Sequence, residues 1–124
     1  YGTGNFYTLN NLYMNGPEIF NFTIYNVPPL IQSNLGANHI TIEDIDYFIF
    51  HQANKFMLEY LRKKIGIPPH KFYIDMAETG NTVSNTIPIA LKNAFEKGVI
   101  GKGSKVMLAG FGVGYSWGAV MLEV

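Results

Sequence analysis

The chain has 124 residues, of which only 15% are charged, and its nine basic and nine acidic residues cancel. This balance argues against a nucleic-acid partner held by phosphate neutralisation, and no apolar run approaches the ~18–20 residues of a membrane-spanning helix. The sequence contains no cysteine, which excludes disulfides, thiolate metal sites and thiol catalysis within these residues.

The length is suited to one domain, and we predict a single domain over residues 1–124 with an irregular lead-in over 1–11. A free domain of ordinary composition has about a quarter of its residues charged. The shortage of charge therefore indicates a surface that faces another domain or subunit. The chain starts at Tyr1 rather than Met, as expected of a piece of a longer protein. Because the surface that faces the missing part should be apolar, we expect the chain to form a homo-oligomer.

The first predicted element is a helix that opens at Pro17 and closes before Gly36. Proline removes a backbone donor and clashes with the preceding turn of a helix. The pair Pro28-Pro29 is therefore predicted to divide this helix into two pieces.

The middle of the chain alternates between strand and helix patterns. Thr41–Asp44 resembles a capped helical turn, and Ile45–Phe50 is apolar on both faces, as in a strand buried on both sides of a sheet. A helix is predicted over Ala53–Ile65, with Gly66 as its terminator. Residues 72–76 are predicted to form a short strand or an extended loop.

The last third of the chain predicts one helix and a strand pair. The helix runs over about Thr86–Lys97, with Ser84 or Asn85 as its cap. Lys105–Gly110 and Trp117–Val124 read as antiparallel strands joined across a glycine loop. Helices that alternate with buried strands predict an α/β layered domain.

His51 lies between a buried strand and a helix, so we expect it near a helix N-terminus. The partial positive charge there favours a neutral imidazole, which can donate one hydrogen bond to a developing enolate or thioester oxygen. The alternative for this histidine is a helix cap or a partner for a backbone carbonyl.

Asn81 offers a second uncharged donor ahead of another predicted helix. Gly80 permits backbone conformations closed to other residues, so the asparagine side chain can be aimed. His51 and Asn81 together would place two neutral donors on one oxygen. The alternative is an ordinary turn followed by a helix cap.

The glycine-rich segment 110–118 is a poor phosphate-binding loop, because a strand rather than a helix follows it. Glycines between two strands allow backbone N–H groups to approach a ligand closely, as in an oxyanion hole. The alternative is a hairpin whose turn requires glycine.

Three segments, His51-Gln52-Ala53-Asn54, Gly80–Asn85 and Gly110–Gly118, follow one another in a specific order. Together they resemble the C-terminal half of the β-ketoacyl-acyl-carrier-protein synthases III, condensing enzymes of the thiolase superfamily. The resemblance extends over about Leu12–Val124. It implies a thiolase-like half, in which a layered mixed β-sheet carries helices packed on its faces.

The resemblance also implies roles for individual residues. His51 and Asn81 match the two catalytic positions other than the cysteine, and Asn54 matches a polar residue of the catalytic pocket. Phe111 matches the aromatic residue beside the catalytic cysteine. The backbone amide of Val113 matches the one that completes the oxyanion hole for the acyl group.

The implied reaction is a decarboxylative Claisen condensation of acyl-coenzyme A with malonyl-acyl-carrier protein in cytoplasmic fatty acid biosynthesis. The nucleophilic cysteine belongs to the N-terminal half, so this chain alone is predicted to be inactive. The resemblance implies no cofactor beyond the thioester substrates. It places Lys63 and Lys64 near the entrance for the acyl carrier protein, although two lysines on a helix can also be a plain solvated face. Three scattered histidines without carboxylates at ligand spacing argue against a metal site.

Two other functions stay open. One is a related ketosynthase of secondary metabolism, and the other is a non-catalytic scaffold subunit that binds acyl-carrier partners. A cysteine in a strand-to-helix turn upstream would indicate an enzyme, and its absence would indicate the scaffold.

Overall fold

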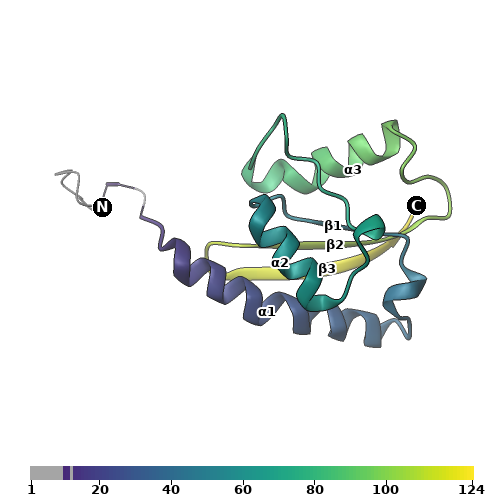
Figure 1. Cartoon of the computed structure of the whole chain (residues 1–124), viewed down its shortest axis with the longest axis horizontal. Coiled ribbons are helices and arrows are strands. Elements are labelled where there is room, and N and C mark those ends of the chain that lie inside the picture. The colour runs from purple at the N-terminus through teal and green to yellow at the C-terminus, as the bar shows by residue number, and fades with distance from the viewer. Residues whose placement is uncertain (1–9, 12) are drawn as a thin grey trace.

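The computed structural model of the chain describes residues 10–11 and 13–124, and it contains a mixed sheet with helices on both faces (Figure 1). The helices and strands are α1 (Gly16–Ala37), β1 (Tyr47–Phe50), α2 (Lys55–Ile65), α3 (Thr86–Glu96), β2 (Lys105–Gly112) and β3 (Ser116–Glu123). The predicted α/β class is confirmed. The predicted lead-in lies outside the described residues, apart from positions 10 and 11.

The sheet has the order β1-β2-β3. β1 pairs with β2 in parallel, with Phe50 opposite Ala109, and β2 pairs with β3 in antiparallel, with Phe111 opposite Trp117. The antiparallel pair predicted across the glycine loop is therefore confirmed. The central strand β2 aligns the end of β1 with the loop that joins β2 to β3.

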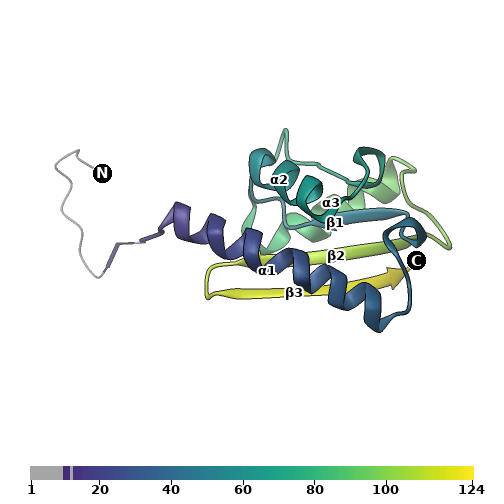
Figure 2. The same ribbon diagram turned by 60° about the horizontal axis from the view of Figure 1, so that its bottom comes forward.

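Alternate residues of the sheet enter two separate cores. Phe48 and Phe50 of β1 pack with Met107 of β2 in the larger core, which α1 and α2 cover. Ile49 and Val106 face the opposite side, where α3 packs on them. Figure 2 shows α1 lying along β2 and β3, while Figure 1 shows α3 on the other side of the sheet. β1 is thus buried on both faces, as its uninterrupted apolar sequence indicated.

The first helix corrects the prediction of two pieces. α1 is one helix over Gly16–Ala37 with Pro28 and Pro29 inside it, while Asn15 caps its start through a 3.2 Å hydrogen bond from the Glu18 amide. The side chains that α1 buries lie on both sides of the prolines: Thr23, Ile24, Val27, Ile31 and Leu35. Packing of this continuous apolar face outweighs the loss of the two proline N–H groups.

The remaining boundaries differ from prediction by one or two residues. Thr41 occupies the cap position of a short 3₁₀ turn, as expected, and its N–H donates to the Asp44 carboxylate at 2.8 Å. α2 begins at Lys55 because Asn54 occupies the cap position, and it ends at Gly66 with a φ of 86°. The segment after residue 72 is an extended loop, with one bridge from Phe72 to Phe48.

The third helix also begins and ends close to its predicted limits. Asn85 rather than Ser84 occupies its cap position, without a side-chain hydrogen bond. Of the helices in the described part of the chain, none has the length and apolar character to cross a membrane.

The prolines of α1 provide a test of this packing. Pro29 is exposed and lacks the N–H that would bond to the Tyr25 carbonyl. We predict that Pro29→Ala raises the free energy of unfolding by about 1–3 kcal/mol, measured by urea denaturation. Pro17→Ala is the matched control, because proline in the first turn costs no hydrogen bond, and it should change stability by less than about 0.5 kcal/mol. A loss of stability in Pro29→Ala would contradict this account of α1.

Candidate active site

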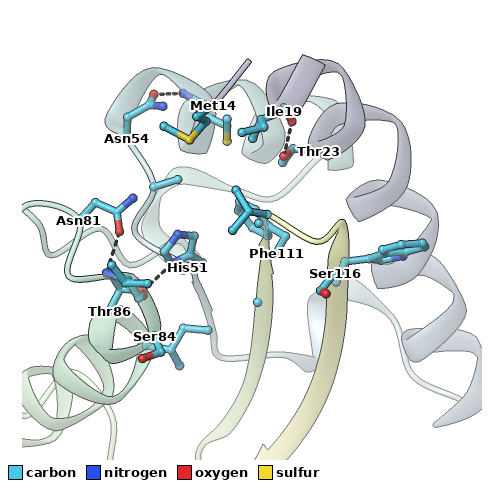
Figure 3. Close-up of a pocket in the computed structure, with 18 of the residues that line it drawn as sticks. Met14, Ile19, Thr23, His51, Asn54, Asn81, Ser84, Thr86, Phe111 and Ser116 are labelled. Carbon is cyan, nitrogen blue, oxygen red and sulfur yellow. Dashed lines mark hydrogen bonds between the residues drawn. The ribbon is translucent and has the colours of Figure 1, made fainter. Parts of the chain in front are cut away.

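A cavity of about 920 Å³ opens where the three sequence segments meet (Figure 3). Its wall includes the five residues predicted for the pocket: His51, Asn54, Asn81, Phe111 and Val113. The N-terminal part of α1 completes the wall with Ile19 and Thr23. Residues that are as far apart as 51 and 113 in sequence therefore share one site.

His51 is held from three directions at the end of β1. Its backbone N–H donates to the Ala109 carbonyl at 2.8 Å, which extends the β1–β2 pairing by one residue. Its ring Nδ1 lies 2.6 Å from the hydroxyl oxygen of Thr86, the buried first residue of α3. The edge-to-face contact with Phe111, at 5.6 Å between ring centroids, fixes the plane of the imidazole. The predicted helix N-terminus is therefore supplied by α3 as well as by the following helix α2.

Burial sets the charge of His51. Desolvation lowers the pKa of this imidazole below its ordinary value of 6.5, because the protein interior disfavours the charged form. The ring is therefore neutral at pH 7 and carries one N–H. If the Thr86 hydroxyl donates to Nδ1, the imidazole N–H proton is on Nε2. If the Thr86 hydroxyl instead donates to the Val83 carbonyl at 3.3 Å, the imidazole proton is on Nδ1 and points at the Thr86 oxygen.

Asn81 is oriented by its own backbone turn. Its Oδ1 accepts from the Val83 N–H at 2.9 Å, so the opposite side of the carboxamide is the Nδ2 donor (Figure 3). Gly80 has a φ of 61°, and Val83, which is 74% exposed, has a φ of 60° in the left-handed region that non-glycine residues rarely adopt. Two unusual backbone conformations thus surround the asparagine, which is common at functional sites.

The other pocket residues occupy structural positions as well. Asn54 caps α2, because its Oδ1 accepts from the Met57 N–H at 2.8 Å. Phe111 is buried near the end of β2, and Val113 lies 68% exposed in the turn between β2 and β3. The backbone at 113 therefore borders the cavity from a strand-to-strand turn, as the glycine-rich sequence indicated.

Comparison with known proteins assigns the family. Residues 35–124 match the family model described as 3-oxoacyl-[acyl-carrier-protein (ACP)] synthase III C terminal. The chain belongs to this family.

Relatives along the whole sequence agree with the family model. The chain is 42% identical over 115 residues to the β-ketoacyl-[acyl-carrier-protein] synthase III of Clostridium novyi, covering 93% of this chain and 36% of the relative. A crystal structure of a 3-oxoacyl-(acyl-carrier-protein) synthase III matches with a TM-score of 0.89 and 46% identity, covering 90% of this chain and 33% of that one. The priming β-ketosynthase of the R1128 polyketide pathway matches with a TM-score of 0.82 and 30% identity, covering 90% and 34%. The chain thus spans about a third of the length of these synthases and has their thiolase-like fold.

Neither of the two lysines predicted for carrier docking lines the cavity. Lys63 and Lys64 are exposed in the last turn of α2, while Asn54 caps the opposite end. Met57 is the pocket residue of α2 nearest to these lysines in sequence, and at 1.5 Å per residue Lys63 and Lys64 lie about 9–11 Å further along the helix axis. The Lys64 ammonium is 5.2 Å from the centre of the Tyr25 ring, which holds it against α1.

Sequence reasoning missed two residues beside His51. In the sequence, Thr86 is recognisable only as the start of a helix, and Gln52 only as the neighbour of His51. A buried polar side chain has no distinct signal in one sequence, because burial depends on the tertiary fold. Within residues 10–11 and 13–124, no three His, Asp or Glu residues are grouped so as to hold a metal ion.

The lowered pKa of His51 predicts a pH dependence of stability. In the unfolded chain His51 takes up a proton near pH 6.5, whereas in the folded protein it takes up this proton only at a lower pH. His51 therefore contributes stability fully above about pH 6.5, and this is lost progressively as the pH falls through the folded pKa. We predict that urea unfolding between about pH 5 and 8 shows this loss and that His51→Gln, which does not titrate, lacks it. Identical pH profiles of the two proteins would contradict a buried neutral imidazole.

Proposed function

We propose that this chain is the catalytic C-terminal part of a 3-oxoacyl-acyl-carrier-protein synthase III. In the full-length protein it would condense acyl-coenzyme A with malonyl-acyl-carrier protein, and the nucleophilic cysteine would come from the N-terminal part. The observation that carries this proposal is the meeting of His51 and Asn81 in the wall of one cavity. Family membership supports the reaction class.

His51 and Asn81 would stabilise the enolate formed by decarboxylation. When the malonyl carboxylate leaves as carbon dioxide, its bonding electrons form a carbanion that the neighbouring thioester oxygen stabilises as an enolate. Hydrogen bonds from Nε2 of His51 and Nδ2 of Asn81 to that oxygen strengthen as its negative charge grows. This role requires donation from Thr86 to Nδ1, since only then does the 2.6 Å contact leave the imidazole proton on Nε2.

Two uncharged donors suit this step. The buried imidazole is neutral near pH 7, and a carboxamide does not titrate, so neither group can protonate the enolate as an imidazolium ion would. The enolate carbon then attacks the acyl-cysteine carbonyl, a carbon–carbon bond forms, and the cysteine departs as thiolate. The Val113 amide would hold the oxyanion of this second step, with Phe111 beside the cysteine. The scheme uses no cofactor beyond the two thioesters.

A second candidate function is condensation in secondary metabolism. The similarity to a polyketide priming β-ketosynthase, at 30% identity and a TM-score of 0.82, favours it. Both functions use the same decarboxylation chemistry and differ in the acyl primer. Turnover of the full-length protein with a series of acyl-coenzyme A primers distinguishes them.

The central test separates donation by Asn81 from its structural role. Asn81→Asp keeps an oxygen that can accept from the Val83 N–H, but it removes the Nδ2 donor and adds negative charge. We predict that Asn81→Asp and His51→Ala each slow malonyl decarboxylation by the full-length protein by about 10²–10³-fold. Acylation of the cysteine by acyl-coenzyme A should continue in both variants.

Asn85→Asp is the matched control, because it places the same charge four residues later at an exposed position outside the cavity wall. It should leave decarboxylation close to the wild-type rate. Normal decarboxylation by His51→Ala or Asn81→Asp would refute the assigned roles. A full-length protein without the upstream cysteine would instead support the scaffold function.

Lys63 and Lys64 are proposed to receive the acidic acyl carrier protein. Their exposure at the end of α2 leaves both ammonium groups accessible to a large partner. We predict that reversing both charges to Glu raises the KM for malonyl-carrier protein by about tenfold, with a weaker effect at high salt. Turnover of a malonyl thioester that lacks the carrier should not change. Lys102→Glu, at an exposed turn before β2, is the control, and an equal effect there would argue against a specific docking site.

A further inference from the structure

Gln52 is one of three buried polar or charged side chains in the described part of the chain, the others being Thr23 and Thr86. It is 1% exposed and follows His51 directly. Its side chain bonds at both ends, because Nε2 donates to the Phe50 carbonyl at 2.7 Å and Oε1 accepts from the Asp75 N–H at 2.8 Å. A buried amide that is satisfied on both sides is rigid and holds its partners in fixed positions.

The segment that Gln52 holds leads to Asn81. Asp75 is followed by a turn in which the Gly80 N–H donates to the Met76 carbonyl at 2.9 Å. Asn81 comes next, with its carboxamide fixed by the Val83 N–H. The loop that carries Asn81 therefore begins at a residue whose backbone N–H is bonded to the side chain of Gln52.

The same segment is tied to the helix that orients His51. The Asp75 carboxylate accepts from the Asn93 side chain of α3 at 2.6 Å, and Lys97, the residue that follows α3, lies 3.4 Å from its other oxygen. The first residue of this helix, Thr86, contacts His51 Nδ1. The contacts thus form a closed circuit from His51 through Gln52, Asp75 and α3 back to His51.

We propose that Gln52 is a positioning residue that fixes His51 and Asn81 relative to each other. This inference rests on the proposed function, in which the two donors meet one oxygen. Two hydrogen bonds on one small oxygen require donors placed to within a fraction of an ångström, and each donor here is on a separate loop. The buried amide of Gln52 connects these loops without adding a charge beside the site.

The first test compares kinetic constants of full-length variants. Gln52→Met keeps the length of the unbranched side chain but replaces its polar carboxamide with an apolar thioether, which removes both hydrogen bonds. We expect its kcat for malonyl decarboxylation to fall on the order of 10–100-fold, because small misplacements of donors have effects of this size. The KM and the rate of cysteine acylation should change little.

Asn34→Ala is the control for a general loss of stability, because Asn34 joins α1 to the Ala119 carbonyl of β3 at 3.0 Å, outside the circuit and the cavity wall. Its kcat should stay near that of the wild type. An unchanged kcat in Gln52→Met, or an equal fall in Asn34→Ala, would overturn the proposal.

The second test uses a conservative variant that switches with pH. In Gln52→Glu a protonated carboxyl can donate to the Phe50 carbonyl and accept from the Asp75 N–H, whereas a carboxylate cannot donate. Burial raises the pKa of such a group, and the Asp75 carboxylate is paired with the Lys97 ammonium, so the charges of these two neighbours oppose each other. The kcat ratio of Gln52→Glu to wild type should therefore rise as the pH is lowered from about 8 toward 7, a range in which the wild-type His51 stays neutral. A ratio independent of pH would overturn the proposal even where Gln52→Met does not fold.

A third measurement does not depend on activity. Amide hydrogen exchange of the full-length protein reports the Asp75 and Val83 N–H groups, which are bonded to Gln52 and Asn81. Gln52→Met should accelerate exchange in residues 75–85 and leave β2 unchanged, and unaltered exchange in 75–85 would contradict the positioning role. If this acceleration is seen while His51→Ala decarboxylates normally, the proposed function fails and the positional link between the loops holds.

Discussion

Parallel pairing of β1 with β2 is the constraint on which the rest of the structure depends. It places Phe50 opposite Ala109 and continues through the bond from the His51 N–H to the Ala109 carbonyl. Because both faces of β1 are buried, a shift of register would exchange the residues of two cores. His51 is therefore fixed beside the turn that follows β2, and the cavity forms at this end of the sheet.

The site is assembled from groups that are polar but uncharged. Thr86 contacts the imidazole, the Val83 N–H orients the Asn81 carboxamide, and Gln52 ties the two loops together. Thr86 and Gln52 are buried and therefore need partners, which come from distant segments in His51 and Asp75, whereas the exposed Asn81 is oriented by the nearby Val83 N–H. The same burial lowers the pKa of His51 and keeps it neutral. Orientation and protonation state thus have one physical origin.

The prediction that α1 is divided into two pieces is wrong because tertiary packing outweighs the local effect of the two prolines. Local rules divide α1 at Pro28-Pro29, since both residues lack the N–H that a helix interior uses. α1 nevertheless continues as one helix, because its buried residues before and after the prolines pack against the sheet and α2. The smaller errors have local causes: Asn54 delays the start of α2 by serving as its cap.

The sequence by itself determined the α/β class, the order of the elements and the segments that meet at the cavity. Apolar periodicity and terminators such as Gly66 are local signals that survive in any tertiary context. It also indicated His51 and Asn81, through the order of three segments that resembles one family, because each residue by itself could equally serve as a helix cap or a turn. Only the tertiary structure decided that Thr86 faces His51 Nδ1 and that Gln52 reaches the Asp75 N–H. The two residues of the first contact are 35 positions apart in sequence, and those of the second are 23 positions apart. Such contacts form only when the sheet and α3 pack together.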